Sequence, residues 1–269
     1  MILLINMKNN EIKISFGGVM AIVLTIVGLV GTSGYFYGKN SNVLGTTVAT
    51  PTGAQQPTKP VVTMDQVKSL FDGKNISFGN KDSKILFVEF SDPSCPFCHV
   101  ASGKNGELNK KMGQQFILKA DGGAYVAPVV EMRKMVDEGK AGFVWLYANG
   151  HGNGELATVA QYCANEKGKF WEVHDLLMSS AGYEMLNTTV KNDKTKSGDL
   201  AAFLKNAVNP TEMKACIDSG KYDGRLTSDM AIAAQFGFQG TPDFYVNTTN
   251  FSGAYSFTDM QSAIDAAGK

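Results

Sequence analysis

The sequence predicts an α/β fold that carries an inserted block of helices and is preceded by a single N-terminal transmembrane helix. Three observations predict it. Residues 14–38 carry no charge and are long enough to cross a hydrocarbon core of roughly 30 Å. Two strongly apolar strands, Ile85–Phe90 and Gly142–Ala148, are separated by segments with helical spacing. A third strand, Asp243–Val246, comes only after a long helical stretch.

The N-terminal region predicts a membrane anchor and a tether. Lys8 and Lys13 precede the uncharged run, which favours a cytoplasmic tail at residues 1–13. A cleavable signal peptide has a shorter apolar region of about 7–15 residues, so residues 14–38 are expected to remain as a signal anchor. Residues 39–63 are rich in Thr, Pro, Gln and Gly, which is typical of a flexible linker. We expect a single-pass protein of the cell membrane with its folded domain outside the cytoplasm.

Composition narrows the functional classes. Acidic and basic residues balance at 25 each, so no long-range field favours nucleic acid as a partner. The four cysteines comprise one close and one distant pair, which suits a compartment where disulfides persist. With three histidines and no second close cysteine pair, neither a metal nor another cofactor is expected.

The folded domain is expected at residues 64–269. It begins with a short amphipathic helix, Met64–Phe71. The strand Ile85–Phe90 is apolar on both faces apart from Glu89, as in the covered centre of a sheet. A helix is expected at Cys98–Met112, directly after this strand.

The following segment leads to the second strand. Phe116–Lys119 is either a brief strand or a loop. Pro128 opens a helix that Gly139 ends, because proline suits a first turn and glycine a C-terminal cap. The strand Gly142–Ala148 comes next.

Residues 149–235 form the predicted helical insert. A helix runs from Leu156 to Leu177, and Gly168 can interrupt it. The polar stretch Ser179–Ser197 indicates an irregular surface loop. Three further helices are expected at Leu200–Ala207, Glu212–Asp218 and Leu226–Phe236.

The chain closes with the strand Asp243–Val246, a hairpin partner at Phe251–Tyr255 and a helix at Phe257–Ala267. The order is therefore β-α-β, a block of helices, then β-β-α. This is the thioredoxin arrangement with an inserted helical subdomain.

The motif Cys95-Pro96-Phe97-Cys98 stands where the first strong strand gives way to a helix. Two cysteines with this spacing can close a small disulfide and reopen it. If Cys95 caps the helix, backbone N–H groups and the helix dipole favour its thiolate. Cys98 then lies one turn on as the resolving thiol, and Pro96 fits the first turn. The motif predicts redox chemistry.

His99 leaves an alternative open, because Cys-x-x-Cys-His is also the spacing of covalent c-type haem attachment. The preceding strand, the proline after Cys95 and the distant Gly240-Thr241-Pro242 motif favour the redox pair. Zinc and a purely structural role for the two cysteines fit less well. Through its charge, His99 could also tune the pair.

Two further features complete the predicted site. Proline after Gly240-Thr241, at the start of a strand, indicates a cis peptide bond, and in thioredoxin-like proteins a cis proline packs beside the disulfide. Thr241, the residue before Pro242, would then offer backbone hydrogen bonds to a substrate chain, so that Thr241 and Pro242 form the second half of the site. A buried Glu89 would have a raised pKa and could carry the proton of the resolving thiol, whereas at a solvated strand edge it would be inert.

Cys163 and Cys216 each lie on the apolar face of a predicted helix. As free thiols they would be small core residues. Outside the cytoplasm, a bridge between two helices of the insert is favoured, and it would constrain the unfolded chain without entering catalysis.

With these residues placed, the domain resembles the DsbA-like thiol–disulfide oxidoreductases. The resemblance rests on FVEFSDPSCPFC, YCANEKGKFWEVHDLL and FGFQGTPDFYVN. It implies that Cys95 attacks, Cys98 resolves, Glu89 is the buried acid and Thr241-Pro242 is the cis-proline loop. The segment at 112–140 is longer than usual for the family, and Pro96-Phe97 lacks the histidine of its best-known oxidases.

The function that follows is the introduction of disulfides into secreted or surface proteins by exchange at Cys95–Cys98. Pro96 and Phe97, with the cis-proline loop, would contact the reduced substrate polypeptide. A membrane-bound partner would reoxidise the enzyme. The alternatives are a reductase or isomerase of the same fold, a c-type haem electron-transfer protein, and a non-catalytic binding scaffold.

Overall fold

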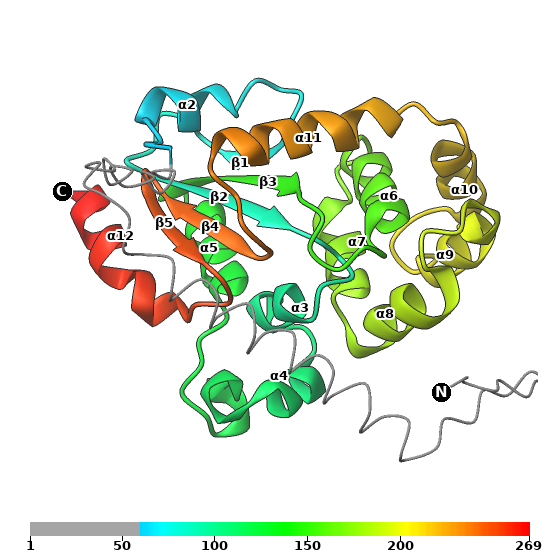
Figure 1. The fold of residues 1–269 in the computed structure, drawn as a ribbon, viewed down its shortest axis with the longest axis horizontal. Helices are drawn as coiled ribbons and strands as arrows, with labels where there is room; N and C mark the ends of the chain where they lie inside the picture. The colour runs from blue at the N-terminus through cyan, green and yellow to red at the C-terminus, as the bar shows by residue number, and fades with distance from the viewer. Residues whose placement is uncertain (1–59) are drawn as a thin grey trace, which may run out of the picture. The chain divides into compact units, whose positions relative to one another are not determined.

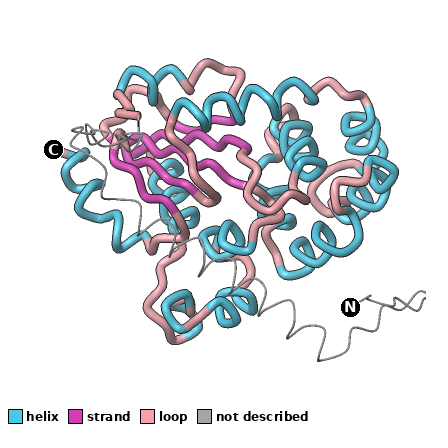
Figure 2. The backbone as a smooth tube through the Cα atoms, viewed as in Figure 1, coloured by secondary structure: helices cyan, strands magenta, loops and turns pink. Residues whose placement is uncertain are grey.

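The computed structural model describes residues 60–269, which contain a five-stranded mixed sheet. The strand order is β1-β3-β2-β4-β5. β2 and β3 are parallel, and the other pairs are antiparallel. Figure 2 shows the strands gathered on one side of the domain and helices around them. The strands are β1 (Ile76–Gly79), β2 (Ile85–Ser91), β3 (Ala141–Tyr147), β4 (Asp243–Val246) and β5 (Thr249–Ser252).

The two central strands, β2 and β3, are buried along their whole length, because helices cover both faces of the sheet (Figure 1). One face packs against α2 (Met64–Ser69) and α11 (Asp223–Gln235). The other face carries α3 (Pro96–Ser102), α5 (Pro128–Asp137) and α12 (Gln261–Gly268). The predicted thioredoxin-like fold with a helical insert is confirmed.

Most helices of the insert pack around a second core, at the right of Figure 1. They are α6 (Glu155–Asn165), α7 (Phe170–Leu177), α9 (Ser197–Phe203) and α10 (Pro210–Asp218), and α8 (Ser180–Glu184) packs against α7. Their buried apolar side chains include Leu156, Val173, Leu177, Leu200 and Leu204. Gly168, with a φ of +65°, separates α6 from α7, so the expected interruption is present.

The single helix expected at Cys98–Met112 is wrong. The structure has two helices here, α3 and α4 (Gly106–Met112). Gly103 ends the first with a φ of +68°, a conformation that favours glycine. The Asn105 side chain then accepts the backbone N–H of Leu108 and begins the second.

The surface loop expected at Ser179–Ser197 is also wrong. The segment contains α8, the π-helical turn η3 (Met185–Val190) and the 3₁₀ turn η4 (Lys194–Lys196). Leu186 and Val190 are fully buried in the core of the insert. Because the segment is polar on average, its sequence did not reveal these two apolar side chains, which pack the segment against the other helices of the insert.

Four smaller differences concern short elements. β1 was not predicted, because an edge strand of four residues with one buried side chain, Ile76, carries no clear pattern. Phe116–Lys119 contains parts of two 3₁₀ turns, η1 (Gln114–Phe116) and η2 (Lys119–Asp121). The hairpin strand begins at Thr249 instead of Phe251. The last helix starts as the 3₁₀ turn η5 (Phe257–Met260) before α12.

Within residues 60–269 the structure has no helix with the length and apolar character needed to cross a bilayer. The predicted tail at 1–13, the span at 14–38 and the linker as far as residue 59 lie outside the described residues.

Candidate active site

Cys95 lies at the start of α3, as the N-cap residue that precedes Pro96. Its carbonyl accepts the backbone N–H of Cys98 at 3.1 Å and that of His99 at 3.2 Å. Both cysteines of the motif are free thiols, so the structure represents the reduced pair. The side chain of Cys95 is 5% exposed and that of Cys98 is 0% exposed. Cys95 is therefore the sulfur nearer to solvent, as expected for the attacking residue.

The surroundings separate the pKa values of the two thiols. The pKa of Cys95 is lowered to about 6, chiefly because the Cys98 thiol donates to its sulfur; backbone N–H groups of Cys98 and Phe97 add to this, and burial opposes it. Burial raises the pKa of Cys98 well above its ordinary value, and the neighbouring Cys95 raises it further. At neutral pH the pair carries one thiolate, at Cys95.

The peptide bond between Thr241 and Pro242 is cis. It brings the carbonyl oxygen of Thr241 to 3.4 Å from the Cys95 sulfur, which donates to it as a thiol. Pro242 is buried and Thr241 is half-buried. The structure therefore joins the two motifs that the sequence separates most widely.

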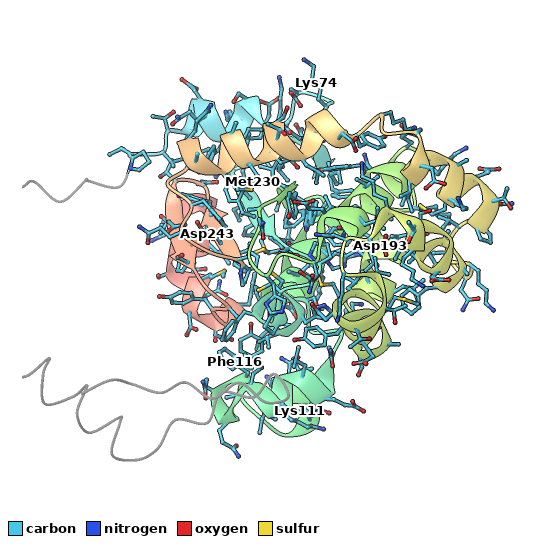
Figure 3. All side chains as sticks on the ribbon, turned by 45° about the vertical axis from the view of Figure 1, so that its right-hand side comes forward. Lys74, Lys111, Phe116, Asp193, Met230 and Asp243 are labelled. Carbon is cyan, nitrogen blue, oxygen red and sulfur yellow. A yellow bond between two sulfur atoms is a disulfide. The ribbon has the colours of Figure 1, made fainter. Side chains whose placement is uncertain are left out.

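Phe97 is an apolar side chain exposed beside the pair, at 39%. Its ring lies 5.9 Å from that of Phe116, and Phe116 lies 5.6 Å from Tyr125. Figure 3 shows Phe116 between α4 and the rest of the domain. The Tyr125 hydroxyl donates to the carbonyl of Ala254 at 3.2 Å. The long segment at 112–140 thus places an aromatic wall next to the redox motif.

Glu89 is fully buried on β2, opposite Trp145 of β3 and Phe244 of β4. Neither carboxylate oxygen has a hydrogen-bond partner of normal geometry among the described residues. Burial raises its pKa to about 7, an effect that Ser91 partly offsets. At neutral pH this carboxyl can therefore both bind and release a proton. Of the two environments considered for Glu89, the structure shows the buried one.

His99 does not tune the pair through charge, contrary to expectation. Its ring is buried, with Nε2 at 2.8 Å from the Pro93 carbonyl and Nδ1 at 2.9 Å from that of Met178. Burial lowers its pKa to about 4, so the imidazole is neutral at pH 7. With both nitrogens facing backbone carbonyls, the ring is not placed to ligate a haem iron. The geometry disfavours the c-type haem alternative.

Cys163 of α6 and Cys216 of α10 form a disulfide with a Cα–Cα distance of 6.1 Å. Their separation in sequence is 53 residues. The bridge joins two helices of the insert and does not include either cysteine of the redox motif. Among the described residues, no cluster of His, Cys, Asp or Glu has the arrangement of a metal site.

Sequence reasoning missed Asp92, which lies between β2 and the redox motif. It is fully buried. Its backbone carbonyl accepts the N–H of Cys95 at 2.9 Å, and its own N–H donates to the Cys98 sulfur at 3.4 Å. The signal available in the sequence was the position of this acidic residue, directly after a strongly apolar strand.

A thioredoxin-like fold that sets a stabilised thiolate against a cis-proline loop, with a buried second thiol one turn on, defines a thiol–disulfide exchange enzyme. The family model described as "Thioredoxin" matches residues 129–266, just over half of the chain. The chain belongs to the thioredoxin family.

Individual curated proteins are also similar to this chain. A protein of Rickettsia bellii, named as a protein-disulfide oxidoreductase, is 26% identical over 223 residues, covering 82% of this chain and 75% of the relative. A protein of Salinispora tropica named Na(+)/H(+) antiporter NhaA 3 is 23% identical over 70% of this chain, and the match spans 24% of its own length.

Solved structures share the fold. BdbD from Bacillus subtilis (oxidised) has a TM-score of 0.54 and 19% identity, covering 73% of this chain and 94% of that structure. The alpha-DsbA1 protein of Wolbachia pipientis has a TM-score of 0.52 and 17% identity, with coverages of 72% and 90%. The family model confirms the thioredoxin part of the predicted resemblance, and these DsbA-like structures share the fold of this chain.

Proposed function

We propose that this protein is a membrane-anchored, extracytoplasmic oxidase that introduces disulfides into secreted or surface polypeptides. The observation that carries the proposal is the unequal pair of thiols: Cys95 favours its thiolate next to Thr241, whereas Cys98 is buried with a raised pKa. A thiolate stabilised at Cys95 stabilises the reduced enzyme, which makes the disulfide oxidising.

The first step is attack of a substrate thiolate on the Cys95 sulfur of the oxidised enzyme. The Cys95–Cys98 bond breaks, and its electron pair leaves on Cys98. Because the pKa of Cys98 is raised, this sulfur takes up a proton. Glu89, buried on the adjacent strand with a pKa of about 7, is the acid proposed to supply it.

The second step releases the product. A second thiolate of the substrate attacks the substrate sulfur of the mixed disulfide, and Cys95 leaves as a thiolate. Its lowered pKa makes it a good leaving group. The substrate has lost two electrons, the enzyme is reduced, and a membrane-bound partner must accept these electrons.

The substrate chain is proposed to lie across Pro96, Phe97 and the Thr241–Pro242 loop. The exposed ring of Phe97 and the aromatic wall behind it offer an apolar contact to side chains that flank the reacting cysteine. The backbone at Thr241 offers hydrogen bonds to an extended chain.

Two observations support the membrane location. Residues 14–38 carry no charge, and the Cys163–Cys216 bridge suits an oxidising compartment. Labelling of intact cells with a membrane-impermeant thiol reagent, with and without prior reduction, tests this placement. Labelling of Cys95 in intact cells supports it, and labelling only after cell lysis contradicts it.

The catalytic proposal is tested with the purified full chain in detergent. Its oxidised form is mixed with a reduced polypeptide that contains two cysteines, and free thiols are counted over time. Stoichiometric conversion of substrate thiols to a disulfide supports an oxidase. If the reduced form instead opens substrate disulfides efficiently and the oxidised form is inert, the protein is a reductase.

A further inference from the structure

The buried carboxylate of Asp92 binds a loop that follows β3. One oxygen accepts backbone N–H groups of Gly150 at 3.0 Å, His151 at 2.8 Å and Gly152 at 3.4 Å. The other oxygen accepts the backbone N–H and the hydroxyl of Ser94, at 2.8 and 2.7 Å. We call residues 150–152 the 150–152 loop. The residues of this loop are exposed to solvent, and its backbone is held against the domain by Asp92 and by Asn192, whose side-chain amide donates to the Gly152 carbonyl at 2.7 Å.

The same loop touches the cis-proline loop. A Cβ atom added at Gly150 would lie 1.7 Å from Oγ1 and 2.8 Å from Cβ of Thr241. No side chain fits between the two loops, and Gly150 is required by this close approach. At the base of the loop, a Cβ at Gly154 would lie 1.9 Å from an Asp92 oxygen. The 150–152 loop is thus packed between Asp92 and Thr241.

These contacts close a ring around the redox pair. Asp92 binds the backbone of Cys95 and the sulfur of Cys98, and its carboxylate binds the 150–152 loop. The loop abuts Thr241, whose carbonyl faces the Cys95 sulfur at 3.4 Å. Asp92, through its backbone on one side and its carboxylate on the other, therefore links the two halves of the site, in addition to the pairing of β2 with β4.

We propose that Asp92 is a positioning residue for polypeptide substrates. By holding the 150–152 loop, it fixes the spacing between the Cys95 sulfur and the Thr241 backbone, and the substrate chain docks across both. This inference rests on the proposed function, because it takes the polypeptide substrate from that proposal.

The proposal separates two kinds of substrate. An extended polypeptide must contact the Cys95 sulfur and the backbone at Thr241 simultaneously. Its binding therefore depends on the spacing between these two groups. A small dithiol needs only the sulfur. Displacing the loop should therefore weaken the reaction with polypeptides and spare the reaction with dithiothreitol.

The test uses the full chain with Asp92→Asn and Gly150→Ala. The two changes disturb the loop from opposite sides. Asp92→Asn replaces the carboxylate that accepts the loop's N–H groups, and Gly150→Ala places a methyl group against the Thr241 side chain. For each variant we would measure KM and kcat with a reduced two-cysteine polypeptide, and the rate at which dithiothreitol reduces the oxidised enzyme. Gly224→Ala is the matched control, because nothing lies within 4 Å of its added Cβ.

The expected result is a rise of about tenfold or more in KM for the polypeptide, with the dithiothreitol rate within about twofold of wild type. In the double variant, the loss of polypeptide binding should be smaller than the sum of the two single losses, since both changes act on the same spacing between Cys95 and Thr241. If Asp92→Asn does not fold, Gly150→Ala decides the question alone.

Equal losses with both substrates, or an unchanged KM in Gly150→Ala, would overturn the positioning role. Failure of the proposed function looks different, because the oxidised wild-type protein itself would then fail to oxidise the polypeptide.

Discussion

The sulfur of Cys95 lies 3.4 Å from the carbonyl oxygen of Thr241, a residue 146 positions further along the chain. This contact brings the end of β2 and the start of β4 to the same place. The redox motif supplies the reacting sulfur, and the cis-proline loop supplies an adjacent backbone surface. The chemistry of the protein depends on both halves of this contact.

Replacement of each cysteine of the motif should give a different outcome. Cys95→Ser removes the sulfur that substrates attack, so dithiol oxidation should fall to the uncatalysed rate. Cys98→Ser, once its Cys95 has been activated as a mixed disulfide, should exchange with a substrate thiol and remain covalently bound to it. Non-reducing electrophoresis detects this adduct, which dithiothreitol should release. Normal turnover by Cys95→Ser would contradict the mechanism.

Phe97→His should make the enzyme a stronger oxidant. An imidazole beside Cys95 would stabilise the thiolate and lower the pKa of Cys95 further. Each unit of pKa corresponds to about 1.4 kcal/mol, or about 30 mV for this two-electron couple. We expect the potential to rise by about 30 mV or more, measured against glutathione. Phe97→Leu, which cannot supply this interaction, is the control and should leave the potential near the wild-type value.

Glu89 should make stability depend on pH. Its folded pKa of about 7 lies above the ordinary value of 4.5, so the protonated carboxyl is favoured in the folded state. Stability is therefore highest at low pH and is lost as the pH rises from about 4.5 to about 7. Relative to Glu89→Gln, the reduced wild-type domain should lose about 3 kcal/mol of unfolding free energy across this range.

Denaturant unfolding of both proteins at several pH values checks this difference. The cost of burying an uncharged amide in the variant does not vary with pH, so it cancels from the slope. Parallel curves for the two proteins between pH 4.5 and 8 would show that the carboxyl does not titrate in this range.

Removal of the insert disulfide should affect stability and not catalysis. The bridge between Cys163 and Cys216 closes a loop of 53 residues, for which the chain-entropy relation gives about 4 kcal/mol. In the double variant Cys163→Ala, Cys216→Ala, the free energy of unfolding should fall by about this amount, and the denaturant midpoint should fall with it. Its rate of dithiol oxidation, measured where the variant is fully folded, should match wild type. A large loss of rate there would assign the bridge a part in the reaction.

Local patterns predict the residues that the structure brings together at the centre of the candidate site. The redox pair lies at a strand-to-helix junction, Glu89 interrupts an apolar strand, and Thr241-Pro242 begins another strand, so each carries its signal within a few residues. The apolar runs of β2 and β3 likewise reveal that both of their faces are covered.

What could not be predicted depends on contacts between distant segments. The carboxylate of Asp92 binds a loop that lies about sixty positions further on, and the glycine at position 150 is explained only by its approach to Thr241. Neither relationship leaves a local pattern. The segment at Ser179–Ser197 failed for a related reason, since its helical turns are held by two buried side chains, Leu186 and Val190, packing on helices elsewhere in the insert.

The redox potential of the Cys95–Cys98 couple, measured at equilibrium with glutathione, tests the central claim most directly. A thiolate favoured at Cys95 and a buried Cys98 predict a couple more positive than about −200 mV, on the oxidising side of protein dithiols. A value near −270 mV, in the range of a reducing thioredoxin, or no disulfide between these two residues under any buffer, would contradict it.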